Sequence, residues 1–199
     1  MGLLRRSGGG SLDALVVGLG NPGRQYERTR HNLGFRVLDL LGERSGASFR
    51  SKYNGRFAET RLGEARVALL GPETYMNLSG PPVASAARFY KLEPAQVIAV
   101  YDDIEVDFDR IRVKLGGGLQ GHNGLRSMAD ALGTRDFLRV RLGVGRPRRG
   151  DPRSIADFVL APFEPEEQRI MAELLDPMAD AVECWLAEGV ERAMSRFNR

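Results

Sequence analysis

The chain has 199 residues, a hydrophobic fraction of 42% and a mean hydropathy of −0.30, values that fit one globular domain with a core of its own. No apolar stretch approaches the roughly 20 residues of a membrane span, and the net charge of +3 alone says little about partners. The single cysteine, Cys184, excludes an intrachain disulfide and a zinc site built from cysteines, and it fits a reducing cytoplasm.

The N-terminal segment, residues 1–12, is rich in glycine and too short in its apolar part to be a secretory signal. We expect a disordered leader there, followed by a single α/β domain over residues 13–199. Short apolar runs bounded by turn residues predict strands at 14–19, 56–62, 66–70, 96–101, 111–115 and 137–144. Helical patterns separate several of these runs, which is typical of a mixed sheet flanked by helices. The second and third strands should form an antiparallel hairpin, and the helix-linked strands should run parallel.

The C-terminal part of the chain is expected to be helical. The helical pattern begins with an acidic turn at 164–167 and is interrupted near Pro177. Its apolar side chains are assigned to the core: Leu160, Ile170, Leu174, Leu175, Trp185 and Leu186.

The most informative segment is 18–32, which reads GLGNPGRQYERTRHN directly after the first predicted strand. Three of its glycines match the G-x-G-x-x-G pattern of dinucleotide-binding proteins. That pattern needs a helix that opens at the glycines, but Pro22 intervenes, and Asp39 falls within a helical pattern instead of at the end of a second strand. We therefore interpret the match as a coincidence and not as a dinucleotide-binding site. A nicotinamide-dependent oxidoreductase remains an alternative that NAD binding would reveal.

Most classes of nucleophile are missing, because the sequence has no G-x-S-x-G elbow, no P-loop and no H-E-x-x-H motif. Catalysis would then depend on histidine, aspartate and amides. His31 is the candidate general base, and it precedes a helix whose positive end would disfavour the protonated ring. Asp102 or Asp103, directly after an apolar strand, would hold the other ring nitrogen, and Asp102 is preferred. The alternative is that His31 is a satisfied structural residue.

Amide side chains offer the remaining polar chemistry. Asn21, Asn77 and Asn123 each carry a donor and an acceptor, so together they could hold a peptide backbone and polarise the attacked carbonyl. A structural interpretation stays open for several of these residues. Asn21, Asn123 and Asp102 are residue types common in turns, and His122 fits the cap of a helix entry.

Cations alternate along two of the predicted strands. Arg112 and Lys114 share one strand face, and Arg139 and Arg141 likewise share one face of the next strand. A basic loop follows at 146–153. A phosphate backbone is the natural partner of such an arrangement. The alternative is that the cations mark the solvated face of each strand.

In their order and spacing, a set of short segments resembles bacterial peptidyl-tRNA hydrolases over nearly the whole chain: GLGNPG, TRHNLGF, TYMNLSG, YDD, GGGLQGHNGLRS and VRLGVGRP. The resemblance implies an esterase that needs no metal or cofactor and cleaves the bond between a peptide and the 3′ end of tRNA. It also implies a cytoplasmic, monomeric enzyme with one catalytic domain, a twisted mixed sheet flanked by helices, and no membrane partner.

The resemblance assigns roles to single residues. His31 is the implied general base, Asp102 supports it, and Asn21 is implied to separate blocked from free aminoacyl groups. Residues implied to contact or line the peptidyl-tRNA site are Tyr26, Tyr75, Met76, Asn77, His122 and Asn123. Cations implied to meet the tRNA phosphates are Lys114 and Arg141, accompanied on their strand faces by Arg112 and Arg139.

The chain departs from the family pattern at two places. Gly71 stands where a lysine is usual ahead of the TYMN segment, which predicts a missing cation near the cleft and an altered substrate affinity. Leu119 and Gln120 stand where small residues are usual, which predicts a stiffer or reshaped loop over the peptide site. A non-catalytic RNA-binding relative is the remaining alternative, and the retained set of histidine, aspartate and asparagine argues against it.

Overall fold

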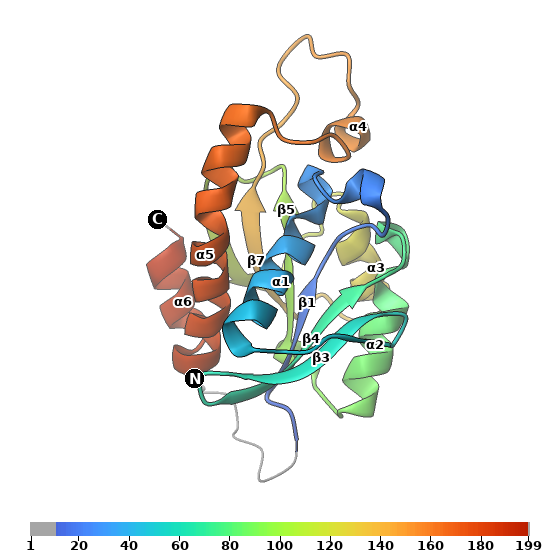
Figure 1. The fold of residues 1–199 in the computed structure, drawn as a ribbon, viewed down its shortest axis with the longest axis vertical. Coiled ribbons are helices and arrows are strands. Elements are labelled where there is room, and N and C mark those ends of the chain that lie inside the picture. The colour runs from blue at the N-terminus through green and yellow to red at the C-terminus, as the bar shows by residue number, and fades with distance from the viewer. Residues whose placement is uncertain (1–10, 199) are drawn as a thin grey trace.

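Seven strands pair into one mixed sheet with the order β2-β3-β4-β1-β5-β7-β6 in the computed structural model, which describes residues 11–198 (Figure 1). The central strand β1 runs parallel to β4 and β5, and β5 runs parallel to β7. The pairs β2–β3, β3–β4 and β6–β7 are antiparallel. The strands are β1 (Ala14–Gly18), β2 (Arg50–Lys52), β3 (Gly55–Leu62), β4 (Ala65–Pro72), β5 (Val97–Asp103), β6 (Ile111–Leu115) and β7 (Leu138–Gly143).

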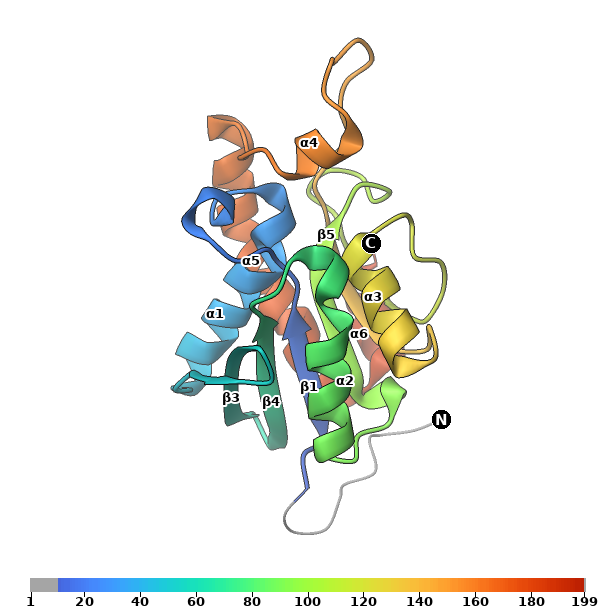
Figure 2. The same ribbon diagram turned by 90° about the vertical axis from the view of Figure 1, so that its right-hand side faces the viewer.

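Helices α1, α5 and α6 cover one face of the sheet, and α2 and α3 cover the other (Figures 1 and 2). Because β1 and β5 lie inside the sheet and are covered on both sides, both strands are buried along their whole length, and β5 is apolar up to the two aspartates that end it. No helix within residues 11–198 is long and apolar enough to cross a membrane. The helices are α1 (Leu33–Ser45), α2 (Gly80–Phe89), α3 (Asn123–Leu132), α4 (Ile155–Val159), α5 (Pro165–Glu188) and α6 (Val190–Phe197).

The structure confirms the mixed α/β fold and the six predicted strands, and it adds the short polar edge strand β2. Two C-terminal expectations are wrong. Helix α5 continues through Pro177, because packing of its apolar side against α1 and the sheet outweighs the one lost backbone hydrogen bond. Leu160 and Ile170, assigned to the core, are exposed.

The predicted leader lies mostly outside the described residues, which begin at residue 11. Leu12, which the prediction placed in the leader, is buried with the apolar cluster formed by β1, α2 and α3. Packed structure therefore begins by Leu12.

Close approach of α1 to the sheet requires a glycine at its first turn. A Cβ atom at Gly34 would overlap the backbone oxygen of Val100 on β5 and the backbone nitrogen of Leu19 after β1. The missing side chain lets the helix start directly on the carboxyl ends of these two strands. The residues just before α1 are thereby placed beside the last residues of β5.

Candidate active site

His31 and Asp102 form a buried hydrogen-bonded pair. His31 lies in the 3-10 turn Arg30–Asn32 that leads into α1, and Asp102 is the penultimate residue of β5. The Nδ1 atom of His31 is 2.8 Å from Oδ1 and 3.0 Å from Oδ2 of Asp102. A carboxylate in this position accepts the Nδ1 proton, which leaves Nε2 of the imidazole as the basic nitrogen.

Asp103, the other candidate acid, belongs to a different interaction. Its Oδ2 atom accepts a hydrogen bond from Nη1 of Arg141 at 3.0 Å. The side chains of successive strand residues point to opposite faces of a sheet, which explains why only one of the two acids reaches His31.

The surroundings of His31 move its pKa in a direction that the sequence did not predict. Burial disfavours the charged ring, but the charge and hydrogen bond of Asp102 outweigh burial and raise the pKa of His31 above its ordinary 6.5. The helix start was expected to disfavour the protonated ring, but the carboxylate acts in the opposite sense and, being in direct contact, dominates. The same contact, together with His122, holds the pKa of the fully buried Asp102 below its ordinary value despite desolvation.

His122 is a second histidine on the same carboxylate. Its Nε2 atom lies 3.4 Å from Oδ1 of Asp102, and its ring centroid lies 4.9 Å from that of His31. Its Nδ1 atom accepts from the backbone amide of Leu125 at 3.3 Å, so it caps α3 as expected for a helix entry. Burial lowers the pKa of His122 and outweighs its hydrogen bond to Asp102.

Asn21 is held by contacts that fix which way its amide points. Its Oδ1 atom accepts from the backbone amide of Met76 at 2.8 Å. Asn32 brackets the Asn21 backbone, accepting from its N–H at 2.8 Å and donating to its carbonyl at 2.9 Å. Because the Met76 amide can only donate, the contacting atom of Asn21 must be the oxygen, and Nδ2 is the group left available to a ligand.

All the predicted catalytic and substrate-contacting residues line one cleft of about 890 Å³ at the carboxyl edge of the sheet. Asn77, Asn123 and Tyr75 are exposed in it, whereas Met76 is buried beneath it. The nine predicted lining residues are Asn21, Tyr26, His31, Tyr75, Met76, Asn77, Asp102, His122 and Asn123.

Sequence reasoning missed one wall of the cleft. This wall consists of apolar side chains in and just after α4: Ile155, Ala156, Val159 and Leu160. The available signal was the pair of large apolar residues Ile155 and Leu160, the first at the start of this five-residue helix and the second just after it; both are exposed. Tyr101, Glu105 and Arg126 also line the cleft and were not predicted.

The predicted phosphate-binding cations do not share one environment. Lys114 and Arg112 are partly exposed on β6, and Arg141 is partly exposed beside the cleft residue Asp103. Burial and the neighbouring Arg141 and Arg139 lower the pKa of Lys114.

Arg139 requires a correction. Its side chain is buried, and it donates to the carbonyl oxygens of Gly117, Gly118 and Arg135. Its guanidinium therefore holds the loop after β6 and does not face a phosphate. Period-two alternation identified its strand face correctly, but it could not show that the loop folds back over that face.

The three residues that depart from the family pattern lie in different surroundings. Gly71 is buried in β4, Leu119 packs on the apolar cluster beneath α2 and α3, and Gln120 lines the cleft with a left-handed φ of 46°. The effects predicted for these departures on affinity and on the loop remain predictions.

Among the described residues, His31, Asp102 and His122 form a group able to hold a metal ion. Their three ligand atoms lie within 4.8 Å of one another. In the structure these atoms bond to each other, so the arrangement is a carboxylate shared by two imidazoles.

The chain is similar to known peptidyl-tRNA hydrolases in both sequence and structure. The family model described as peptidyl-tRNA hydrolase matches residues 15–199. The chain is 52% identical to the peptidyl-tRNA hydrolase of Frankia casuarinae, covering 92% of this chain and 93% of the relative. It is 49% identical to that of Nocardia farcinica, with coverages of 93% and 96%. A crystal structure of peptidyl-tRNA hydrolase from Acinetobacter baumannii matches with a TM-score of 0.87 at 34% identity, covering 93% of this chain and 94% of that one.

Proposed function

The chain belongs to the peptidyl-tRNA hydrolase family. We therefore propose that His31 is the general base that activates water for hydrolysis of the ester between a peptide and its tRNA. Family membership identifies the substrate. The observation that carries the mechanism is the hydrogen bond from Nδ1 of His31 to Asp102 within the cleft. Such a bond fixes the ring tautomer and stabilises the imidazolium that forms during catalysis.

The reaction needs one water and no covalent enzyme intermediate. Nε2 of His31 takes a proton from the water while its oxygen attacks the ester carbonyl carbon, and the carbonyl oxygen becomes an oxyanion. When the tetrahedral intermediate collapses, the bond to the ribose oxygen breaks, and His31 returns its proton to that oxygen. The products are the free peptide acid and a tRNA with its terminal hydroxyl restored.

Exposed amides around the cleft are suited to bind the substrate and the oxyanion. Asn77 and Asn123 are exposed in the cleft and carry donors of the required type. The Nδ2 group of Asn21 would donate to the carbonyl of an N-acyl group. A free aminoacyl group has no carbonyl at that position, which would let Asn21 separate blocked from free aminoacyl-tRNA.

Partly exposed cations next to the cleft are proposed to hold the tRNA backbone. Lys114 and Arg141 lie close enough to influence each other, and Arg141 adjoins the cleft through Asp103. Because neutralised phosphates release counterions, we expect binding to weaken steeply as salt increases. A flat salt response would contradict this assignment.

We also propose that the enzyme acts as a monomer in the cytoplasm. The resemblance to the family supports a monomer, and the lone cysteine suits a reducing compartment. Sedimentation at working concentration would test the monomer, since a dimer would sediment at twice the mass.

The test is release of free tRNA from N-acetyl-aminoacyl-tRNA by the wild type and by His31→Ala, in the presence of a metal chelator. We expect rapid release by the wild type and a loss of about 10²- to 10⁴-fold in kcat for the variant, the usual contribution of a general base. Aminoacyl-tRNA with a free amine serves as the control substrate and should be cleaved poorly. A wild type that binds the tRNA without releasing the acyl group would instead support the RNA-binding alternative.

A further inference from the structure

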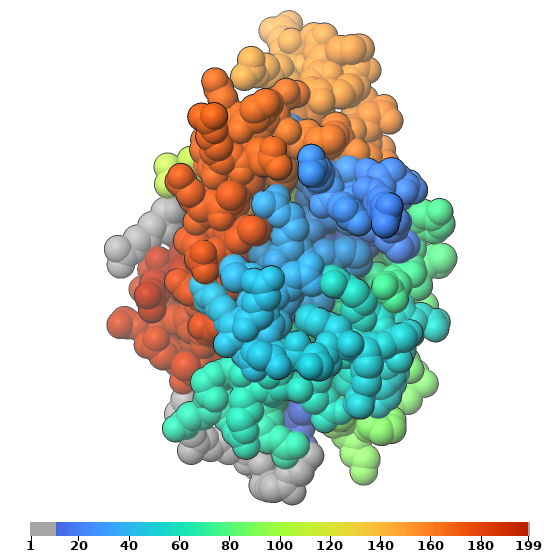
Figure 3. All heavy atoms as spheres, viewed as in Figure 1, coloured from blue at the N-terminus to red at the C-terminus, as the bar shows by residue number. Residues whose placement is uncertain are grey.

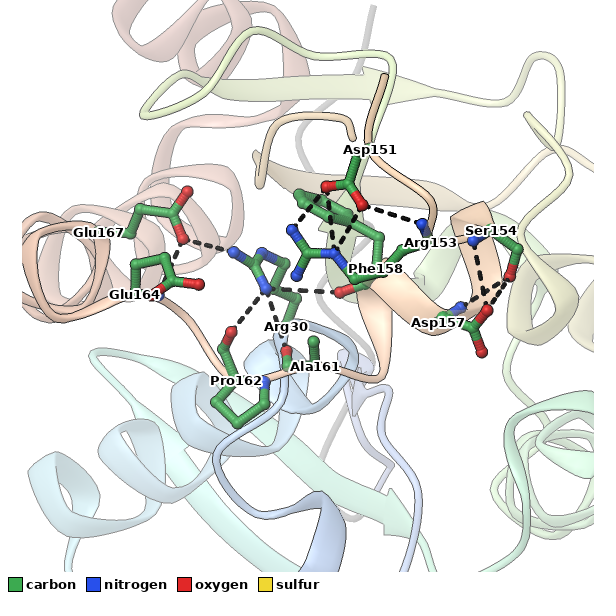
Figure 4. Close-up of polar contacts among 10 residues, drawn as sticks. All are labelled: Arg30, Asp151, Arg153, Ser154, Asp157, Phe158, Ala161, Pro162, Glu164 and Glu167. Atoms are coloured by element: carbon green, nitrogen blue, oxygen red, sulfur yellow. Dashed lines mark hydrogen bonds and ion pairs between the residues drawn. The ribbon is translucent and has the colours of Figure 1, made fainter. Parts of the chain in front are cut away.

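Arg30 is a buried cation whose side chain bonds to a distant part of the chain. Its side chain is 1% exposed, and its Nη1 atom donates to the carbonyl oxygens of Phe158, Ala161 and Pro162 at 3.4, 3.2 and 2.6 Å (Figure 4). Its Nη2 atom bonds to the carboxylate of Glu167 near the start of α5. A buried charge is tolerated only when it is paired and hydrogen-bonded, so these partners fix where the segment between α4 and α5 lies.

Two further contacts strengthen this connection. The Arg30 guanidinium lies over the Phe158 and Phe163 rings, with its Cζ atom 4.2 and 4.9 Å from their centroids. Its backbone amide donates to the carbonyl of Ala161 at 3.2 Å, and Thr29 forms an antiparallel bridge with Pro162. Backbone and side chain of the turn before α1 therefore hold the same segment.

The segment held by Arg30 carries the apolar wall of the cleft. Helix α4 has five residues, a length that is not stable in isolation and must be fixed by tertiary contacts. A Ser154–Asp157 capping box orders its first turn, and Arg30 bonds to its fourth residue, Phe158. In Figure 3 the orange surface of this region borders the blue surface of the segment before α1.

We propose that Arg30 is a positioning residue that clamps the α4 wall over the cleft, so that the wall can hold apolar side chains of the substrate's peptide. The wall offers Ile155, Ala156, Val159 and Leu160, which suit an apolar peptide side chain and not a phosphate. His31 follows Arg30 directly in the chain, so one short turn places both the base and the peptide wall. This proposal rests on the proposed function and adds a determinant of peptide binding to it.

A second arginine provides a matched control for a general effect on stability. Arg44, at the end of α1, also bonds to α5, through the carboxylates of Asp176, Asp180 and Glu183. These bonds are exposed, and none of the four residues lines the cleft. Arg44→Gln therefore breaks a contact to the same helix without touching the wall.

The experiment compares Arg30→Lys, Arg44→Gln and the wild type on N-acetyl-leucyl-tRNA and N-acetyl-glycyl-tRNA. Lysine keeps the charge beside Glu167, but it lacks the planar fork whose two ends reach the carbonyl oxygens and the Glu167 carboxylate at once. For Arg30→Lys we expect KM to rise about tenfold with the leucyl substrate and about twofold with the glycyl substrate, because only leucine fills the wall. The kcat value and its pH profile should stay within about twofold of the wild type, since the direct contact between His31 and Asp102 is not one of the contacts that Arg30 makes.

Hydrogen exchange tests the clamp without relying on activity. In Arg30→Lys, the amides of Leu160 and Ala161, which bond within the α4 segment, should exchange at least about tenfold faster than in the wild type. Arg44→Gln should leave these amides unchanged. If Arg30→Lys does not fold, Glu167→Gln weakens the same clamp more gently and should raise the leucyl KM about twofold to threefold.

Several results would overturn the proposal: an unchanged leucyl KM, an equal rise for both substrates, a fall in kcat alone, or unchanged exchange at Leu160 and Ala161. Failure of the proposed function has a different signature, because the wild type itself would then release no tRNA. The exchange measurement would still decide whether Arg30 holds α4.

Discussion

His31 and His122 both hydrogen-bond to Asp102, yet their pKa values are moved in opposite directions. His31 contacts both carboxylate oxygens, at 2.8 and 3.0 Å, and this contact outweighs burial. His122 has one longer contact of 3.4 Å, and its second nitrogen already accepts from Leu125. Protonation of His122 would place a donor against that amide, so the ring is held neutral.

Two histidines that share a carboxylate therefore do not have the same role. His31 keeps a free basic nitrogen and a partner that stabilises its charged form, as a general base requires. His122 is a neutral donor that caps α3 and steadies Asp102. Variants at the three positions can separate these roles.

The largest effect is expected for Asp102→Asn, which removes the charge that both histidines contact. We expect kcat to fall by about 10²- to 10⁴-fold, because the base loses its orientation and the stabilisation of its imidazolium. Burial would then be the main remaining influence, so the pKa of His31 should fall, and the acid limb of the kcat/KM profile should move to lower pH. A limb that stays in place would show that Asp102 does not raise the pKa of His31.

For His122→Asn we expect a smaller loss of activity and a shift of the His31 pKa in the opposite direction, upward. Asparagine is a good N-cap, so this variant preserves the start of α3 while removing the ring N–H that donates to Asp102. Asp102 would then hold the His31 proton more strongly, the acid limb should move to higher pH, and kcat/KM near neutrality should fall about threefold to tenfold. A shift to lower pH would contradict the neutral-donor role of His122.

The smallest effect is expected in stability. His122 has a lowered pKa in the folded state, so below pH 6.5 the unfolded chain binds a proton that the folded chain lacks, and stability falls. His31 has a raised pKa, so its contribution is present below pH 6.5 and is lost as pH rises through its folded pKa.

Urea unfolding at pH 7.5 and pH 5.5 measures the direction in which each histidine changes stability with pH. Relative to the wild type, His122→Asn should lose less stability on acidification, and His31→Asn should lose more, by at most about 1.4 kcal/mol per pH unit for each group. The slope of the unfolding free energy against urea should be unchanged in both variants. Equal pH responses in the two variants would mean that the histidines do not differ.

Much of the site was predictable because it rests on local patterns. Apolar runs identified β1 and β5, and the acids that follow β5 were expected at the carboxyl edge where ligands bind. The capping role of His122 followed from the Asn-Gly pair behind it. Family resemblance supplied the roles of single residues, which chemistry alone had left open.

The remainder depended on contacts between distant parts of the chain. Nothing local shows that Arg139 is covered by the loop after β6, or that Arg30 reaches a segment more than a hundred residues away. The direction of the His31 pKa required the distance to Asp102, since the helix start and the carboxylate act in opposite senses. Leu160, one residue of the α4 wall, was assigned to the core because exposed apolar residues look the same in sequence as buried ones.

His31 is tested as the general base by an NMR titration of the two imidazoles alongside the pH profile of kcat/KM for N-acetyl-aminoacyl-tRNA. We predict that His31 titrates above pH 6.5 with the same pKa as the acid limb of the rate, whereas His122 remains neutral with its proton on Nε2 through that range. An acid limb that follows His122, or that matches neither ring, would contradict His31 as the general base.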